Sequence, residues 1–248
     1  MSATLGAFSA GDELAFRSIV ARAAARFRPE GRGPSYLARG KLGGDPVFRA
    51  LLRNGLIASR ARVLDLGCGP GMLPALLAAA EQTPADAWPA TWAPPAAHWT
   101  LHGIDLRRKA IETGRRALSD LSPRVQLSAG DLRRVPLPAC DVAVLLDVLH
   151  YIDADAQRAV LARVHAALAP SGRLLLRVGD AVPTWRFRFS LFVDWCVISA
   201  RGSLQPRFCC RPLAQWISLL ETIGFAVTAQ PMSEGTPFAN VLLIATRA

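Results

Sequence analysis

The sequence lacks several features by which particular classes of protein are recognised. Lysine is nearly absent from its 248 residues, with only Lys41 and Lys109 present. No apolar run approaches the roughly 20 residues that a membrane-spanning helix needs, and the closest candidate, 187–199, is interrupted by Arg188 and Asp194. The sequence also shows no internal repeat and no low-complexity tract. These absences argue against a membrane-spanning protein, a repeat protein and a disordered chain.

Cysteine is scarce and follows no metal-binding pattern. The five cysteines form no C-x-x-C pair, and no histidine stands at a metal-ligand spacing from them. The opening segment, MSATLGAFSA, lacks the basic and apolar blocks of a signal peptide. We therefore expect no metal site, reduced cysteines and a cytoplasmic protein.

The charge of the chain is strongly one-sided. The net charge is +10 and the pI is near 10.6, and arginine supplies almost all of the positive charge. A basic surface attracts polyanions such as nucleic acid, anionic lipid or an acidic carrier protein. The arginines are scattered rather than gathered in a block, so we attribute them to overall composition. We expect no specific nucleic-acid partner and no membrane span, while peripheral membrane contact and the oligomeric state stay open.

The most informative stretch is Val63-Leu-Asp-Leu-Gly-Cys-Gly-Pro-Gly71. A short apolar run ends in Asp65, three glycines follow at alternate positions, and an apolar helical pattern begins at Met72. This order predicts a strand, a tight turn and a helix start, with a backbone that can lie directly against a ligand. The dinucleotide fingerprint places its last glycine one position later, and Pro70 lacks an N–H for a pyrophosphate. The turn therefore favours a nucleoside with little phosphate.

At this stretch the chain resembles the class I S-adenosylmethionine-dependent methyltransferases, whose first motif reads much like VLDLGCGPG. The resemblance implies a Rossmann-like, doubly wound α/β fold with a seven-stranded sheet, mostly parallel with a C-terminal antiparallel strand. It implies an enzyme that uses S-adenosylmethionine as its cofactor. The residues that it places at the methionine and ribose end of the cofactor are Asp65, Gly67, Cys68, Gly69 and Gly71.

Further cofactor residues follow the next strands. Asp105 ends a predicted strand at 100–104, where a carboxylate can accept both ribose hydroxyls. It stands 40 positions after Asp65 (65 to 105), about twice the usual separation of roughly 20, and the proline- and tryptophan-rich segment 83–99 accounts for the excess. By resemblance, an acid after the third strand meets the adenine amino group, and its neighbour packs on the ring. The remaining residues assigned to the cofactor are Leu106, Asp131, Leu132, Leu146 and Asp147.

We expect one structural unit with two parts, an N-terminal helical cap over 1–60 and a methyltransferase domain over 61–248. A lid insertion at 181–212 is the segment least like the generic domain, and it carries an aromatic stripe with flanking arginines, among them Arg201 and Arg207. An acceptor under such a lid is expected to be aromatic or acyl-like, either a small molecule or bound to a carrier protein. The segments YLARGKL and WRFRFS loosely resemble methyltransferases of bacterial aryl-polyene pigment assembly, which favours secondary-metabolite or pigment biosynthesis.

Methyl transfer from a sulfonium needs an acceptor held about 3 Å from the methyl group, and a base only when the acceptor is neutral. His150, in the segment DVLHYI after the fourth predicted strand, is the leading candidate for that base. Tyr151 and Tyr36 are further catalytic candidates, and Asp147 and Asp180 are weaker alternatives to His150. A mechanism without a base also stays open.

The sequence also bears on three competing functions. A nicotinamide-dependent oxidoreductase would need a glycine at Met72 and a Tyr-x-x-x-Lys pair, which neither tyrosine offers. A nucleic-acid methyltransferase would carry a (D/N)PPY-type signature, which the segment after the fourth strand lacks. A non-catalytic S-adenosylmethionine-binding regulatory protein stays open, since Asp65, Asp105 and Asp131 predict binding and not turnover.

Overall fold

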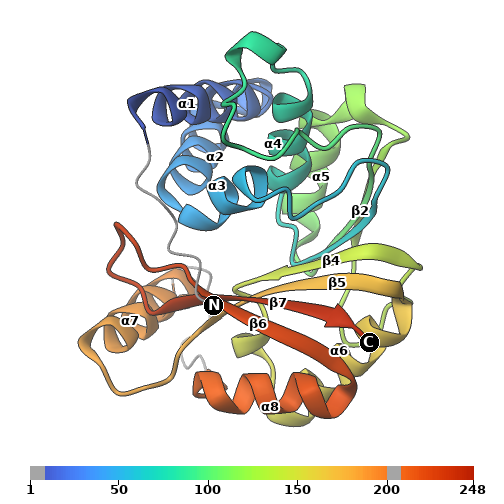
Figure 1. Cartoon of the computed structure of the whole chain (residues 1–248), viewed down its shortest axis with the longest axis vertical. Coiled ribbons are helices and arrows are strands. Elements are labelled where there is room, and N and C mark those ends of the chain that lie inside the picture. Colours follow the sequence, from blue (N-terminus) through green and yellow to red (C-terminus); the bar gives the residue numbers. More distant parts are fainter. Residues whose placement is uncertain (1–8, 200–207) are drawn as a thin grey trace.

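A computed structural model of the chain describes residues 9–199 and 208–248, arranged around one seven-stranded sheet (Figure 1). The strand order is β3-β2-β1-β4-β5-β7-β6, in which β1 to β5 pair in parallel and β7 is antiparallel to both of its neighbours. This is the doubly wound order expected from the sequence, so the predicted fold class is confirmed. The strands are β1 (Arg62–Leu66), β2 (Thr100–Asp105), β3 (Val125–Ala129), β4 (Cys140–Leu146), β5 (Leu168–Gly179), β6 (Phe225–Pro231) and β7 (Asn240–Arg247).

Helices cover both faces of the sheet (Figure 1). One face carries α1 (Ala10–Ala25), α2 (Arg32–Gly44), α3 (Pro46–Arg53), α4 (Met72–Glu81) and α5 (Arg108–Ala117). The other face carries α6 (Ala154–Ala167) and α8 (Leu213–Ile223). The helix α7 (Trp185–Ser199) lies beside the segment that joins β6 to β7. Short 3₁₀ turns occur at Arg28–Glu30, Ala85–Ala87, Ser119–Leu121 and Leu149–Tyr151.

The central strands are buried on both sides, as strands of a parallel sheet should be. In β4, Val142 and Val144 pack into the core under α1 to α5, while Ala143 and Leu145 pack into the core under α6 and α8. Successive side chains of a strand point to opposite faces, so a continuous apolar run serves both cores.

Local capping signals set several helix ends. Asp45 accepts the Val47 N–H at 3.2 Å, and Pro46 occupies the first helical position, as the sequence predicts. Asp153 accepts the Ala156 N–H at 2.8 Å and begins α6. Gly224 ends α8 with a φ of 109°, a conformation that glycine adopts without steric cost.

The predicted irregular loop at 83–99 is confirmed, apart from its one short 3₁₀ turn. Its tryptophans attach it to the body of the protein: Trp92 and Trp99 are buried, and the Trp92 ring lies 6.3 Å from that of Phe16 on α1. Arg124 stacks over Trp99 with its guanidinium carbon 3.8 Å from the ring centroid.

Two predicted boundaries are wrong. The proline- and glycine-rich sequence of 29–35 predicts a link, but α2 begins within it, because Pro34 falls in the first turn, where no intrahelical donor is needed. The fifth strand begins at Leu168 rather than at Arg173, because the preceding helix ends at Ala167 and Leu168 already pairs with Cys140. Among the described residues, no helix is both long and apolar enough to cross a bilayer.

Candidate active site

The glycine turn after β1 has the geometry that its sequence predicts. Gly67, Gly69 and Gly71 all have positive φ, at 84°, 57° and 80°. A Cβ added to Gly67 would lie 2.3 Å from a methyl carbon of Val148, so the turn packs tightly against the segment after β4. Only glycine satisfies both requirements at Gly67, a left-handed backbone and this close approach.

Asp65 is the penultimate residue of β1, and its carboxylate is buried, with 6% of the residue exposed. Across the part of the chain that the structure describes, it accepts no hydrogen bond. Burial, and then the negative charge of Asp105, raise the pKa of Asp65 to about 7. A buried acid without a partner is costly to ionise, and a ligand cation placed beside it would remove that cost.

Asp105 ends β2 and is also buried, but its oxygens are fully engaged. One oxygen accepts the Gly69 N–H at 2.8 Å, and the other accepts the Arg107 backbone N–H at 2.8 Å. The Arg107 guanidinium adds two longer bonds, at 3.0 and 3.2 Å. A Cβ built on Gly69 would lie 3.3 Å from Arg107 Nη2, so this guanidinium rests against the glycine turn.

Asp131, after β3, is held by Arg133, which donates from its backbone and from its side chain at 2.7 to 3.0 Å. The side-chain hydrogen bond from Arg133 is the main reason that the pKa of Asp131 lies below its usual range. Leu106 is 72% exposed. Leu132 is half-buried and packs on the core under α6. The three acids therefore follow three adjacent strands at one edge of the sheet, as the sequence predicts.

A cavity of about 480 Å³ lies at the same edge, beyond the ends of β4 and β5. Its walls come from α2, from the segment after β4, from α7 and from the segment before β7. His150 and Tyr151 both line it, with ring centroids 3.9 Å apart, and the His150 carbonyl accepts the Cys209 N–H at 2.9 Å. Leu149, Phe187, Leu191 and Phe238 make part of its lining apolar.

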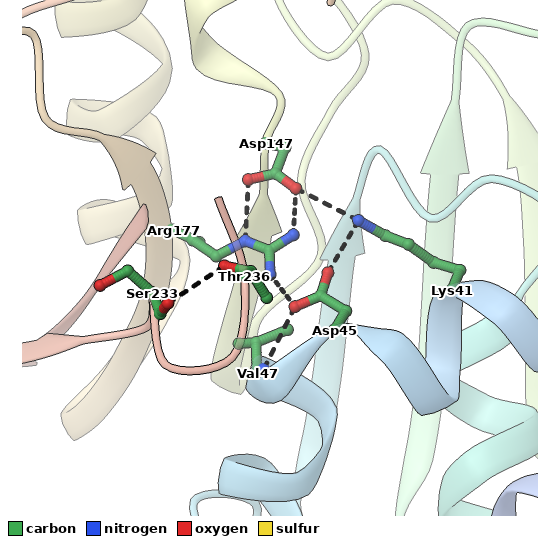
Figure 2. A network of polar contacts seen from close by, with 7 residues as sticks. All are labelled: Lys41, Asp45, Val47, Asp147, Arg177, Ser233 and Thr236. Carbon is green, nitrogen blue, oxygen red and sulfur yellow. Dashed lines mark hydrogen bonds and ion pairs between the residues drawn. The ribbon is translucent and has the colours of Figure 1, made fainter. Parts of the chain in front are cut away.

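Four charged side chains form a network at one wall of this cavity (Figure 2). Arg177, on β5, donates to both oxygens of Asp147 and to one oxygen of Asp45. The ammonium of Lys41, on α2, lies 2.8 Å from the second oxygen of Asp45 and 3.4 Å from Asp147. The network thus joins the N-terminal helices to the ends of β4 and β5.

The network is electrically balanced, with two positive and two negative groups. Arg177 is only 1% exposed, and its guanidinium cannot lose its proton. Burial opposes the ionisation of Asp147, but the charges of Arg177 and Lys41 outweigh it and hold the pKa of Asp147 well below its usual range. His150 contributes to the same lowering, so its ring lies within electrostatic reach of Asp147.

The structure brings most of the predicted site residues together. Cys68 is buried inside the glycine turn, where burial raises the pKa of its thiol. Leu146 is half-buried at the end of β4. Tyr36 is 71% exposed on α2, outside the cavity lining, so its catalytic assignment stays a prediction. Asp180 accepts the Leu213 N–H at 2.9 Å and so holds the start of α8.

Sequence reasoning missed Lys41, Asp45 and Arg177 as site residues. It assigned Asp147 to the cofactor, whereas here the Asp147 carboxylate is paired with Arg177 and lines the cavity. One local signal was available, because LLLRVG places a charge inside an otherwise apolar strand, and a buried charge needs a partner. The predicted lid insertion is described only in part, and Arg201 and Arg207 lie outside the described residues.

Comparisons with known proteins agree with this geometry. Residues 64–174 match the methyltransferase domain family. The chain is 35% identical over 136 residues to the carboxy-S-adenosyl-L-methionine synthase of Chromohalobacter salexigens, a match that covers 52% of this chain and 46% of that protein. The chain therefore spans about half the length of this curated relative.

Two solved structures show the same fold. An O-methyltransferase family protein from Burkholderia thailandensis superposes with a TM-score of 0.62 at 23% identity, over 96% of this chain and 67% of that one. Human N-acetylserotonin methyltransferase, solved in complex with S-adenosylmethionine, superposes with a TM-score of 0.54 at 17% identity, over 88% of this chain and 57% of that one. The resemblance drawn from the glycine turn is thus confirmed for the domain and for its fold.

The Arg177 network predicts a large and specific effect on stability. Arg177→Met should lower the free energy of unfolding at pH 7 by about 3–5 kcal/mol, because it leaves two carboxylates beside one partly exposed lysine. Arg173→Met, at an exposed position of the same strand, should change it by at most about 0.5 kcal/mol. Urea denaturation of the two variants and the wild type measures both effects.

The same measurement at lower pH checks the cause. A carboxylate with a lowered pKa in the folded state stabilises the protein above its unfolded pKa, and this contribution is lost as the pH falls. The gap between wild type and Arg177→Met should therefore narrow as the pH falls from about 4 toward 2, where the unfolded chain binds protons that the folded wild type does not. A gap that stays constant over this range would show that lost packing, and not charge, explains the destabilisation.

Proposed function

We propose that this chain, which belongs to the class I S-adenosylmethionine-dependent methyltransferases, transfers a methyl group to a small organic acceptor bound in the cavity beside His150. The observation that carries the proposal is the position of this cavity. It lies at the sheet edge that holds the glycine turn and its acids, and a histidine and a tyrosine line it. A cofactor at the turn and an acceptor in the cavity would be neighbours.

The residues at the glycine turn fit S-adenosylmethionine. The buried, unpartnered carboxylate of Asp65 suits the ammonium of the methionine part, and Asp105 suits the ribose hydroxyls. Gly69 and Gly71 expose backbone against which a nucleoside can lie. When bound, this cofactor supplies a methyl group already activated by a positively charged sulfur.

The chain's own residues would then position the acceptor and manage its proton. His150, on the cavity wall, would take the proton of an acceptor hydroxyl or amine as the methyl group is transferred. Asp147 would favour the protonated imidazole, because its carboxylate lies within electrostatic reach of His150. The apolar side chains Phe187 and Leu191 would keep water from the acceptor.

The outer face of α7 supports delivery of the acceptor by a partner, such as a carrier protein. Trp185, Phe192 and Trp195 are 65%, 60% and 49% exposed, and Arg186 lies beside them with its guanidinium carbon 5.4 Å from a Trp185 ring. Aromatic and arginine side chains are the types enriched where proteins meet partners. Other side chains of the same helix, Phe187 and Leu191 among them, line the cavity, so α7 would connect the docking surface to the acceptor.

The first prediction from the proposed function concerns Asp65 and the pH dependence of cofactor binding. Below pH 7 Asp65 is protonated in the free protein, and an adjacent ligand ammonium favours its ionised form, so binding should release a proton. As the pH rises from roughly 5.5 to 7, the dissociation constant of S-adenosylmethionine should decrease by up to about tenfold per pH unit, so that binding becomes tighter. Calorimetry in buffers of different ionisation enthalpy counts the released proton.

Asp65→Asn provides the matched control, since it keeps the shape and removes the titration. It should bind S-adenosylmethionine more weakly and without this pH slope. In the free wild type, stability from Asp65 should decrease as the pH rises from about 4 to 7, because the unfolded chain releases the proton first. The variant should therefore unfold at a higher urea concentration than the wild type at pH 8. An unchanged pH slope in Asp65→Asn would remove Asp65 from the site.

A second prediction follows from the contact between Arg107 and Asp105. The ribose hydroxyls would compete with the Arg107 guanidinium for the carboxylate of Asp105. The ion pair between Arg107 and Asp105 is partly exposed and therefore contributes about 0–1 kcal/mol. Arg107→Ala should tighten binding of S-adenosylmethionine by up to about fivefold, while the exposed neighbour Arg108→Ala should leave it unchanged. Weaker binding in Arg107→Ala would mean that Arg107 holds the ligand rather than competing with it.

The third prediction tests catalysis itself. With any acceptor that the wild type methylates, His150→Ala should lower kcat by about 10²–10⁴, while the affinity for S-adenosylmethionine changes little. His102→Ala, a histidine on β2 outside the cavity lining, should leave kcat unchanged. Full turnover in His150→Ala would favour transfer by proximity alone. If no acceptor is methylated although the cofactor binds, a non-catalytic binding protein becomes the better account.

A further inference from the structure

Three of the residues that line the acceptor cavity are glycines. Gly40 and Gly44 belong to α2, and Gly179 ends β5 beside Asn240 of β7. None of the three has a positive φ, so no backbone conformation requires glycine there. A Cβ added at any of them would meet no heavy atom within 4 Å. Close packing therefore does not require glycine there either.

Gly103 and Gly114 differ in this respect. A Cβ on Gly103 would lie 2.7 Å from a methyl carbon of Leu127, and one on Gly114 would lie 2.5 Å from the Pro70 carbonyl oxygen. These two positions need glycine because neighbouring chain segments occupy the space. At Gly40, Gly44 and Gly179 the space is open, and all three positions line the cavity.

We propose that Gly40, Gly44 and Gly179 form a subsite that receives a planar ring of the acceptor. Backbone without a side chain offers a flat surface that a rigid ring can approach to van der Waals contact. The aromatic side chains Phe187 and Phe238 also line the cavity and supply ring faces and edges for stacking. A cavity of about 480 Å³ is large enough for an acceptor of more than one ring.

This inference rests on the proposed function for its catalytic consequence, but binding tests it separately. The probes are 2-naphthol, which is planar and bicyclic, and 1-octanol, which is linear and carries the same hydroxyl group. Binding of each to the full chain, in the presence of the demethylated cofactor product, is measured by calorimetry. The wild type should bind 2-naphthol more tightly than 1-octanol.

Larger side chains at the subsite should remove this preference. Gly40→Leu and Gly179→Leu should weaken 2-naphthol binding by about tenfold or more, because each fills space that the ring would use. Gly33→Leu is the matched control, since Gly33 lies on the same helix, has no heavy atom within 4 Å of an added Cβ, and is outside the cavity lining. It should leave binding of both probes unchanged.

Folding is not expected to obscure the result. At Gly40 leucine favours the helix more than glycine does, and at Gly179, which ends β5, an added Cβ meets no heavy atom within 4 Å. Gly40→Ala, with a smaller side chain than leucine, should give an intermediate loss of 2-naphthol affinity. Thermal unfolding of each variant checks that it is folded. Equal binding of the two probes by the wild type would overturn the subsite, as would wild-type 2-naphthol affinity in a folded Gly40→Leu protein. If 2-naphthol binds as expected but no acceptor is ever methylated, the subsite stands and the proposed function fails.

Discussion

The architecture of the site depends on how one buried guanidinium is neutralised. Arg177 stands in an apolar strand, keeps its charge at every accessible pH, and must therefore be paired. Its partners are Asp147, at the end of the neighbouring strand, and Asp45, which lies 132 positions away at the start of α3. Because the planar guanidinium of Arg177 donates to the carboxylates of both Asp147 and Asp45, it fixes the N-terminal helices relative to the sheet edge. The cavity between them takes its walls from that arrangement.

Two pairs of acids at the same edge are in opposite electrostatic situations. Asp45 and Asp147 face a buried arginine and a lysine, and these positive charges outweigh burial and hold the pKa of Asp147 well below its usual range. Asp105 is paired with the partly exposed Arg107, whereas burial, and then the negative charge of Asp105, raise the pKa of Asp65 to about 7. A positively charged ligand therefore gains most beside Asp65. This difference distinguishes the proposed cofactor side from the proposed acceptor side before any ligand is considered.

The fold and the position of the acids beside the glycine turn could be predicted from the sequence because their signals are local. A strand end, a glycine turn and an acid occupy a few consecutive positions, as around Asp65 and Asp105, and the parallel sheet brings such positions to one edge. The acceptor side was not predictable in the same way, since Asp45 and Arg177 meet only in the folded chain. Tyr36 shows a related limit: the predicted link ends just before it at Ser35, and no helix was predicted for its segment, so the helix face on which it stands could not be predicted.

The charge network and the glycine-lined wall also depend on each other. The helix α2 contains four glycines among its 13 residues, and each glycine in a helix interior costs about 0.5–1 kcal/mol relative to alanine. Such a helix needs tertiary contacts in order to form. Ala38 and Leu42 supply them on one side, where both are fully buried, and Lys41 and the following Asp45 tie its last turn to Arg177. The contacts that stabilise α2 thus come from Ala38, Leu42, Lys41 and Asp45. They do not involve Gly40 and Gly44, which can therefore line the cavity without a side chain and leave room for an acceptor.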